Sequence, residues 1–257
     1  MDQPTTLSVS DRRHLVRDAL SLIESPGRRL LLRGGLNVGT LAMLTGCSLN
    51  DGRAAEGVLR HVSTFNDRVQ AWLFNPRKLA PEYSADQITR PFPFNAFYPE
   101  SRAPVINGAD FALAVGGLVA DKRPWTLEKL NALPQESQIT RHVCVEGWSA
   151  IGQWSGVRFS HFLHLVGADL QAKYVGFQCA DGYWTSIDMP TALHPQTQLT
   201  LGFGGAVLPV RYGFPMKLRI PTKLGFKNPK HITEIVVTNQ YPGGYWEKRG
   251  YNWFSGL

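Results

Sequence analysis

Residues 141–156 read Arg-His-Val-Cys-Val-Glu-Gly-Trp-Ser-Ala-Ile-Gly-Gln-Trp-Ser-Gly, and the rest of the chain is organised around them. Cys144 stands in a short β-branched run that leads into a Gly-rich loop, which predicts a strand ending near the cysteine. Arg141 and His142 precede it, and positively charged neighbours lower the pKa of a thiol and favour the metal-binding thiolate. The pattern therefore makes Cys144 a candidate soft metal ligand. A buried structural cysteine is the alternative, because a thiol also packs as a small hydrophobe.

The composition indicates an ordinary globular protein with a basic surface. A chain of 257 residues can bury a substantial core, as one large domain or two small ones. The net charge of +7 and a pI near 9.5 indicate an anionic ligand, an acidic partner or a negatively charged membrane surface. No nucleic-acid-binding motif accompanies this charge. The three cysteines, Cys47, Cys144 and Cys179, are too few for a disulfide framework or a zinc site.

Residues 1–50 are expected to form an N-terminal helix followed by an export signal. Arg28 and Arg29 precede a mild apolar run that is too short to span a bilayer as an ordinary helix, a pattern that resembles a twin-arginine signal. The run closes in Leu44-Thr45-Gly46-Cys47, which resembles a lipobox with Cys47 as the lipidated residue. We expect a periplasmic protein, either cleaved in this segment or lipid-anchored through Cys47. A buried helix of a cytoplasmic protein is the alternative.

Residues 51–257 are expected to form one α+β domain, mainly short β-strands with peripheral helices. Alternating or β-branched runs bounded by turn residues predict the strands, and apolar side chains at helical spacing predict the helices. Residues 57–74 are interpreted as a helix that packs against the domain. Strands are predicted at 111–119, 172–179, 183–187, near 218 and at 231–238, and short helices at 124–130 and 157–166.

A basic segment lies between residues 211 and 230. It contains no acidic residue, and glycines and prolines interrupt it, so its cations are expected on loops around a short strand. Loops can direct several cations and backbone N–H groups toward one phosphate. A solvated surface is the alternative interpretation of such a charge run. The cations are Arg211, Lys217, Arg219, Lys223, Lys227 and Lys230.

Several motifs, in order along the chain, resemble the sulfite-oxidase-fold molybdopterin oxidoreductases. The stretch 141–148, followed by Trp-Ser-Gly-Val at 154–157, is most similar to the periplasmic methionine-sulfoxide reductase catalytic subunits, and the similarity extends from about residue 95 to 238. The resemblance implies a sulfite-oxidase-type molybdopterin-binding domain and a molybdenum-molybdopterin cofactor. It also implies that the Cys144 thiolate binds molybdenum beside two dithiolene sulfurs of the cofactor, and makes Cys144 the catalytic residue.

The same resemblance assigns further contacts with the cofactor. Cys179 stands where the family has a threonine, Lys217 where it has an arginine and Tyr212 where it has an asparagine. A thiol donates a weaker hydrogen bond than a hydroxyl, and a lysine keeps the charge of an arginine without its bidentate geometry. The implied cofactor-binding residues are Asn95, Tyr98, Pro99, Cys179, His194, Tyr212, Lys217, Asn228, Pro229 and Lys230.

The resemblance implies two-electron oxo transfer at molybdenum, in the direction of sulfoxide reduction. It also implies a monomeric catalytic subunit, a small-molecule substrate and electrons from a membrane cytochrome, without nucleic acid. Sulfite dehydrogenation is the first alternative, although Glu146 beside the metal would repel sulfite. The second alternative is a non-catalytic exported module that binds an anion through its basic loops. Molybdenum retention and the effect of Cys144→Ser distinguish this module from a molybdenum enzyme.

Overall fold

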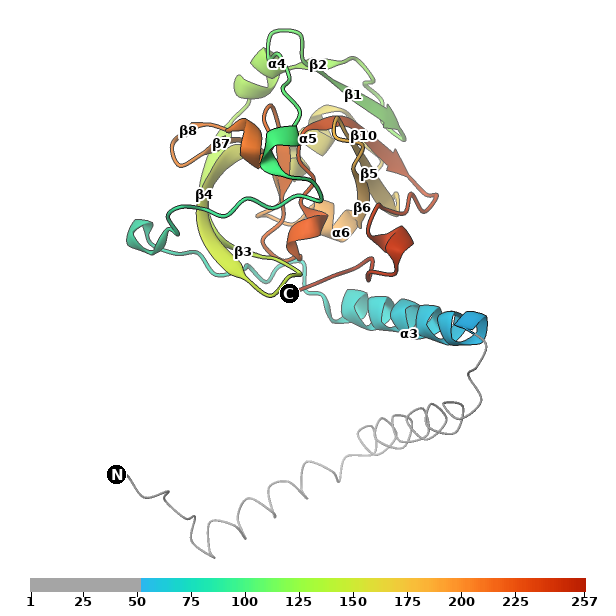
Figure 1. Ribbon diagram of the computed structural model, residues 1–257. Coiled ribbons are helices and arrows are strands. Elements are labelled where there is room, and N and C mark those ends of the chain that lie inside the picture. The colour runs from blue at the N-terminus through green and yellow to red at the C-terminus, as the bar shows by residue number, and fades with distance from the viewer. Residues whose placement is uncertain (1–51) are drawn as a thin grey trace, which may run out of the picture. The chain divides into compact units, whose positions relative to one another are not determined.

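The computed structural model describes residues 52–257 (Figure 1). The chain consists of two compact units, residues 1–59 and 60–257. The predictions made for residues 1–50, namely the N-terminal helix, the export signal and the lipobox, lie outside the described residues. Within residues 52–257, no helix is both long and apolar enough to cross a membrane.

Two β-sheets form the second unit and lie on opposite sides of it in Figure 1. The first has the strand order β2-β1-β10-β5-β6, in which only β1 and β10 are parallel. Its strands are β1 (Ala112–Gly117), β2 (Trp125–Thr126), β5 (Tyr174–Cys179), β6 (Trp184–Asp188) and β10 (Ile232–Thr238). The second sheet is antiparallel, with the order β3-β4-β7-β8 and β9 paired to β7. Its strands are β3 (Gln135–Val143), β4 (Ser149–Arg158), β7 (Gln198–Phe203), β8 (Ala206–Val207) and β9 (Lys217–Arg219).

The helices are few, and most are short. The α-helices are α3 (Gly52–Leu73), α4 (Leu127–Asn131), α5 (Phe159–Leu165) and α6 (Met189–Ala192). The 3₁₀ turns are η1 (Ala85–Gln87), η2 (Glu100–Arg102), η3 (Val210–Tyr212), η4 (Gly225–Lys227) and η5 (Glu247–Arg249). The helix α4 begins at Leu127, three residues after the predicted start at 124, because Thr126 caps it by accepting a hydrogen bond from the backbone N–H of Lys129. The α+β class, with mainly short strands, is confirmed.

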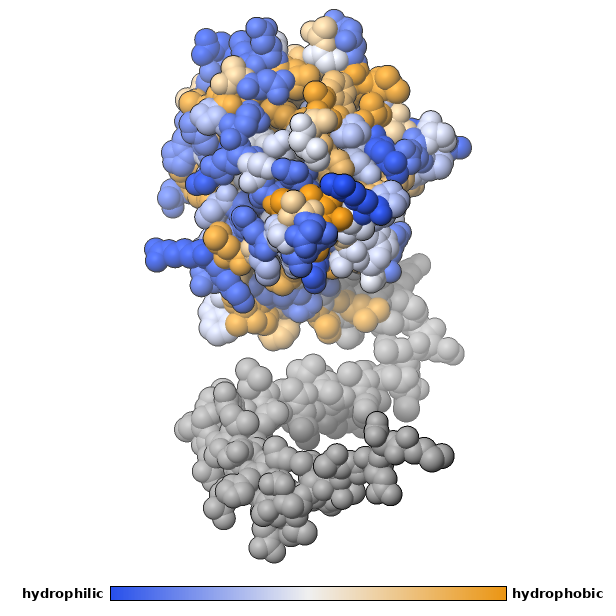
Figure 2. All heavy atoms as spheres, turned by 90° about the vertical axis from the view of Figure 1, so that its left-hand side faces the viewer, coloured by the Kyte–Doolittle hydropathy of each residue, from blue (hydrophilic) through white to orange (hydrophobic). Residues whose placement is uncertain are grey.

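The main core fills the space between the two sheets. The strands of one sheet contribute Leu113, Phe177 and Ile235, while Leu199 and Leu218 come from the other, and all five are buried. The apolar face of α5 completes this core. Burial of each such side chain contributes roughly 1.5–3 kcal/mol. Hydrophilic and hydrophobic side chains are interspersed over the face shown in Figure 2, as on ordinary protein surfaces.

A second, smaller core lies around Trp154 on β4. The Trp154 side chain is fully buried and forms edge or tilted ring contacts with Phe92, Phe203 and Tyr212. Successive side chains along β4 point to alternate faces of the sheet, and Trp154 points into this smaller core. A bulge at residues 155–156 shifts the alternation, and Val157 beyond it points into the main core. Residues 157–158 pair with Leu199 and Gln198 of β7 and remain in the strand, so α5 begins at Phe159 rather than at the predicted residue 157.

The helix α3 occupies the predicted position, but the prediction that its apolar face packs against the domain is wrong. Its polar side contacts the C-terminal segment, residues 252–256. The Asp67 carboxylate accepts hydrogen bonds from the backbone N–H groups of Trp253 and Phe254 and from the Asn252 side chain. Gln70 Oε1 accepts another from the N–H of Gly256. The apolar residues Val62, Phe65 and Trp72 are exposed instead.

We predict that Asp67→Ala detaches α3 from the C-terminal segment. The change removes the acceptor of three hydrogen bonds and leaves part-buried N–H groups unpaired, which costs about 2–4 kcal/mol in docking free energy. Hydrogen exchange at Trp253 and Phe254 should accelerate, and the urea midpoint should fall if docking is part of the cooperative unit. The control is Asn66→Ala at the adjacent exposed position, which should leave both measurements unchanged.

Candidate molybdopterin site

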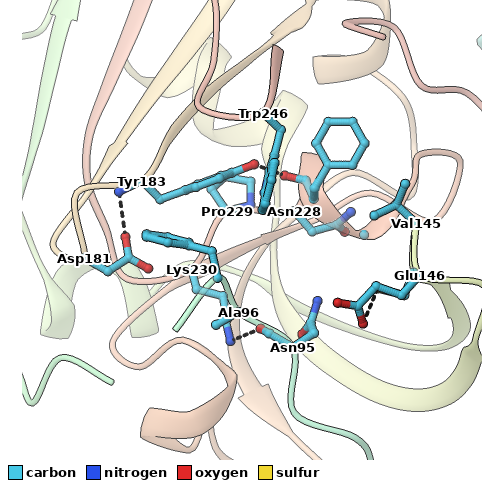
Figure 3. A pocket seen from close by; sticks show the side chains of 14 residues that line it. Asn95, Ala96, Val145, Glu146, Asp181, Tyr183, Asn228, Pro229, Lys230 and Trp246 are labelled. Atoms are coloured by element: carbon cyan, nitrogen blue, oxygen red, sulfur yellow. Dashed lines mark hydrogen bonds between the residues drawn. The ribbon is translucent and has the colours of Figure 1, made fainter. Parts of the chain in front are cut away.

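A cavity opens where the β3–β4 hairpin, the β5–β6 turn and the loops around η4 meet (Figure 3). Its volume is about 90 Å³. Cys144 and Glu146 come from the hairpin loop, whereas Asp181 and Tyr183 come from the β5–β6 turn. Its remaining walls are Asn95, Ala96, Phe97, Val145, Gly225, Phe226, Asn228, Pro229, Lys230 and Trp246. Five separate regions of the chain therefore contribute to one site.

Cys144 lies one residue beyond the end of β3, as the sequence predicts. A tight turn holds it, since its backbone N–H donates to the carbonyl of Trp148 at 2.8 Å and its own carbonyl accepts from the N–H of Gly147 at 3.2 Å. Gly147 has φ +93°, a left-handed conformation that glycine adopts without strain. The turn thereby presents the buried Cys144 thiol to the cavity.

The expected lowering of the Cys144 pKa by its preceding neighbours is wrong for the protein alone. Burial raises the pKa of the Cys144 thiol, and Glu146, whose Oε2 lies 3.7 Å from Sγ, raises it further. Burial and nearby cations keep the pKa of His142 well below its usual value, so its ring is neutral. Arg141 is exposed and its guanidinium lies over the ring of Tyr83. A bound metal cation is thus needed to hold Cys144 as a thiolate.

The six cations of the basic segment divide into two groups. Three have acidic neighbours from other parts of the chain: Arg211 with Glu100 at 3.1 Å, Lys223 with Asp188 at 3.8 Å, and Lys227 with Glu247 at 2.6 Å. The other three, Lys217, Arg219 and Lys230, are buried and form no ion pair within the described part of the chain. We call these three the cation cluster.

The cation cluster is assembled by strand alternation and one glycine. Lys217 and Arg219 are two residues apart on β9 and therefore share a face, on which both cationic groups lie over the Trp154 ring, at 4.7 and 5.8 Å from its centroid. Gly213 brings Lys230 to them. It has φ +119°, and a Cβ there would lie 2.9 Å from Lys230 Cβ and 3.1 Å from Lys217 Cβ.

The cation cluster carries uncompensated charge. Burial lowers the pKa of Lys217 well below its usual value, and the charges of Lys230 and Arg219 lower it further. Burial also lowers the pKa of Arg219 to about 9 and that of Lys230 to about 8. Buried cations are normally paired with acids, so this arrangement fits an anionic ligand that supplies the missing charge.

Buried N–H groups without a protein acceptor lie beside the cation cluster. Arg219 Nε and Trp154 Nε1 have no hydrogen-bond partner, and neither has His142 Nδ1. With the Asn95 amide donating to His142 Nε2 at 3.2 Å, the neutral His142 ring carries its proton on Nδ1. A Cβ on Gly225 would lie 2.5 Å from His142 Nε2, so a glycine is required beside this ring. These donors match the acceptor oxygens of a phosphate or a pterin.

Residues 228–230 form a turn that connects the cation cluster to the cavity. The Asn228 carbonyl oxygen Oδ1 accepts from Arg219 at 3.0 Å and from the N–H of Ile220 at 2.7 Å. Pro229 and Asn228 also line the cavity. Lys230 Nζ donates to the backbone carbonyl of Asn95 at 2.6 Å, which ties this turn to the early loop (Figure 3).

The predicted cofactor contacts do not all line the cavity. Asn95, Asn228, Pro229 and Lys230 line it together with Cys144, while Lys217 lies in the adjoining cation cluster. Tyr98 and Cys179 lie just behind the wall: Tyr98 donates its hydroxyl proton to Asp181 at 2.8 Å, and Cys179 is a buried thiol at the end of β5. Pro99 precedes η2 and is not a lining residue.

Tyr212 and His194, which were also predicted to contact the cofactor, form hydrogen bonds within the fold. The hydroxyl of Tyr212 donates to the carbonyl of Phe92 at 2.6 Å within the Trp154 core. His194 does not line the cavity: its Nε2 lies 3.1 Å from the carbonyl of Lys78, and its Nδ1 accepts from the N–H of Gln196. Its ring packs near Phe74, so its polar groups are satisfied within the fold.

Sequence reasoning missed Asp181, Tyr183 and Trp246. Asp181 sits in the Asp-Gly hairpin turn, where a carboxylate is also an ordinary turn residue. One of its oxygens accepts from the N–H of Tyr183 (Figure 3), and the other accepts from the Tyr98 hydroxyl, which fixes the carboxylate at the cavity wall. Trp246 comes from the aromatic C-terminal region, whose role the sequence left open. Only the tertiary fold brings these three side chains beside Cys144.

Comparisons with known proteins agree with this geometry. Residues 100–246 match the family described as oxidoreductase molybdopterin binding domain. A protein of Azospira oryzae named for protein-methionine-sulfoxide reductase, subunit YedZ1, is 61% identical over 240 residues, which cover 93% of this chain and 92% of the relative. The protein-methionine-sulfoxide reductase catalytic subunit MsrP of Burkholderia mallei is 31% identical over 198 residues, covering 67% of this chain and 59% of MsrP.

A solved structure shares the fold. The sulfane dehydrogenase SoxCD from Paracoccus pantotrophus aligns with a TM-score of 0.51 and 19% identity, covering 54% of this chain and 40% of that chain. This chain belongs to the molybdopterin-binding oxidoreductase family and has a sulfite-oxidase-type domain. It is a molybdopterin-dependent oxidoreductase, and its cofactor is molybdenum-molybdopterin.

The residues present fit this cofactor. Cys144 offers a soft sulfur ligand at the cavity, and the cation cluster with its unpaired donors offers a site for the phosphate. Among the described residues no group of three His, Cys, Asp or Glu side chains could hold a metal ion alone. A single protein thiolate is consistent with a metal whose other ligands come from the cofactor.

We predict opposite effects of Lys217→Met on the cofactor-free and loaded protein. The change removes a buried charge without a counter-ion, so the cofactor-free protein should become more stable by about 1–3 kcal/mol. Cofactor loading should fall at least tenfold, because a charge-assisted contact with phosphate is lost. Urea unfolding and molybdenum per chain are the measurements. Lys173→Met, at an exposed lysine, is the control, and a fall in both stability and loading would indicate a purely structural Lys217.

The pH dependence of stability should reveal the burial of Lys230, in the cation cluster, and of Lys223, which lies 3.8 Å from Asp188. The folded pKa is about 8 for Lys230 and about 7 for Lys223, against 10.5 for the ordinary side chain. Between these values the unfolded chain binds more protons than the folded one, so stability rises with pH. The urea midpoint of the cofactor-free protein should therefore increase from pH 7 to 9.5. Inorganic phosphate should reduce this slope, whereas chloride at equal ionic strength should not.

Proposed function

We propose that the protein reduces a sulfoxide, with methionine sulfoxide as the substrate type. The observation that carries this proposal is the cavity at Cys144, whose walls combine aromatic side chains with two carboxylates, those of Glu146 and Asp181. Aromatic walls suit a neutral, partly apolar substrate, and carboxylates disfavour an anion such as sulfite. The names of the two reductase relatives support the same reaction.

The overall reaction consumes two electrons and two protons. A sulfoxide loses its oxygen as water, the sulfur–oxygen bond breaks, and the sulfur is reduced to a thioether. When bound, the cofactor would supply the two-electron oxo-transfer chemistry for this reaction. In this proposal the Cys144 thiolate holds the metal at the cavity, and the cation cluster holds the phosphate that fixes the cofactor's orientation.

The cavity walls act on the substrate. Trp246, Tyr183 and Phe97 bound the space opposite the hairpin loop and would pack against the thioether chain of the substrate. Tyr183 is held in place, because its hydroxyl donates to the carbonyl of Phe226 at 2.6 Å. A sulfoxide whose apolar groups contact these rings would leave its oxygen free to face the metal.

The location and electron source belong to the same proposal. The twin-arginine-like segment supports export to the periplasm after folding, with Cys47 as a possible lipid anchor site by its lipobox context. One relative is named as a subunit and others as a catalytic subunit, which supports a separate electron-donating partner in the membrane, a cytochrome in our proposal. Electron transfer to the site would then occur in one-electron steps.

We predict that Cys144→Ser abolishes sulfoxide reduction with a dye donor, lowering kcat at least a hundredfold, because a neutral hydroxyl is a poor ligand for a metal that prefers a soft thiolate. The reaction is followed as dye oxidation, beside molybdenum content. The control is Cys179→Ser, which alters the other buried cysteine of the domain and should retain substantial activity. A parent protein that lacks molybdenum despite adequate cofactor supply would contradict the proposal.

The cavity carboxylates give a second prediction, on specificity. Glu146→Gln removes a negative charge beside Cys144 without changing the size of the side chain. The ratio of kcat/KM for sulfite oxidation to that for sulfoxide reduction should rise at least tenfold. Glu128→Gln, on α4, is the matched control and should leave the ratio unchanged. An unchanged ratio in Glu146→Gln would mean that this charge does not select the substrate.

A further inference from the structure

The helix α3 presents a row of large apolar side chains to solvent. Val62, Phe65, Trp72 and Leu73 are 53%, 68%, 82% and 66% exposed, and we call these four residues the outer face of α3. Their spacing of three, seven and one places them on one side of the helix. A row of this kind is normally buried, so its exposure marks an interaction surface.

The docking of α3 explains why this face stays uncovered. Ser63, Asp67 and Gln70 are spaced four and three residues apart and form the opposite side of the helix. This side receives hydrogen bonds from residues 252–256, through the Ser63 carbonyl at 3.2 Å, the Asp67 carboxylate at 2.8–3.2 Å and Gln70 Oε1 at 3.0 Å. An amphipathic helix docked by its polar side leaves its apolar side available.

The charge around the outer face is positive. Residues 61–80 contain three cations, Arg68, Arg77 and Lys78, against one acidic residue, Asp67. The Asp67 carboxylate is already bonded to the C-terminal segment on the other side of the helix. Arg68 follows Phe65 by three residues and precedes Trp72 by four, so it lies beside both aromatic side chains on the exposed surface.

We propose that the outer face of α3 binds the surface of an anionic lipid bilayer. The helix lies in the plane of the interface, with Val62, Phe65 and Trp72 inserted at the headgroup boundary. The cations beside them contact lipid phosphates. Tryptophan suits this depth, because its ring is apolar and its N–H remains near water.

The same charges disfavour a second copy of the chain on this face. In a two-fold dimer through the outer face, Arg68 of one helix would approach Arg68 of the other. Within residues 61–73 of each helix the only carboxylate is that of Asp67, which is already bonded to the C-terminal segment. A lipid surface supplies both an apolar layer and phosphate groups. The proposal concerns a face made by α3 and does not depend on the reaction at Cys144.

The test measures binding of the full-length holoenzyme to vesicles of phosphatidylcholine with or without 30% phosphatidylglycerol. The variant Phe65→Gln/Trp72→Gln keeps good helix-forming residues at both positions. Its partition coefficient for anionic vesicles should fall at least tenfold, and Arg68→Gln should weaken binding to anionic vesicles only. Added salt should weaken binding of the parent. Val105→Gln/Val207→Gln changes two apolar residues that are 88% and 70% exposed elsewhere, and should bind like the parent.

Circular dichroism and dye-linked activity should be unchanged in all variants, because none of these residues lines the cavity. Equal binding by the parent and the Phe65→Gln/Trp72→Gln variant would overturn the proposal, as would a parent that does not bind anionic vesicles.

A parent dimer that this variant dissociates would assign the face to a second copy instead. Altered protease sensitivity of residues 1–51, with vesicle binding unchanged, would assign it to that segment. Binding that requires a membrane protein in the vesicles would assign it to a protein partner.

Discussion

Burial of three cations without an acidic partner is the constraint on which the site depends. Lys217, Arg219 and Lys230 converge beside Trp154, and burial lowers the pKa of each of them. A fold that keeps such groups from water loses stability unless an anion occupies the space. The cofactor phosphate is therefore part of the electrostatic balance of the domain. Cofactor binding and folding stability are linked by the same three side chains.

The neutral His142 ring and the raised pKa of Cys144 follow from the same environment. Both groups lie where water is largely excluded, so each favours its uncharged form in the protein alone. A bound metal would favour the thiolate of Cys144, and a bound phosphate would favour the protonated form of the lysines. The charge state of the site is thus determined jointly by the protein and the cofactor, and neighbouring residues in sequence do not determine it.

The sequence predicted those features that depend on local chemistry. The strand before Cys144 and the strands predicted at 172–179 and 183–187 each involve a few consecutive residues, and the structure contains all three as β3, β5 and β6. The pairing of Lys227 with Glu247 joins residues twenty positions apart, and its geometry depends on the whole fold. For this reason the sequence could not tell which cations of the basic segment remain for a ligand. The position of His194 away from the cavity lining was likewise not predictable, because its partners, including the carbonyl of Lys78, are distant in sequence.

The hydrogen bonds between α3 and residues 252–256 join positions more than 180 residues apart. These hydrogen bonds connect the beginning of the domain to its end. Contacts of such long sequence separation form only after the intervening sheets are in place. Proteolytic cleavage between Tyr251 and Gly256 would break these hydrogen bonds and release α3. The two cores and the cavity walls at Cys144 would keep their own contacts. The membrane contact proposed for α3 and the chemistry at Cys144 thus depend on separate parts of this domain.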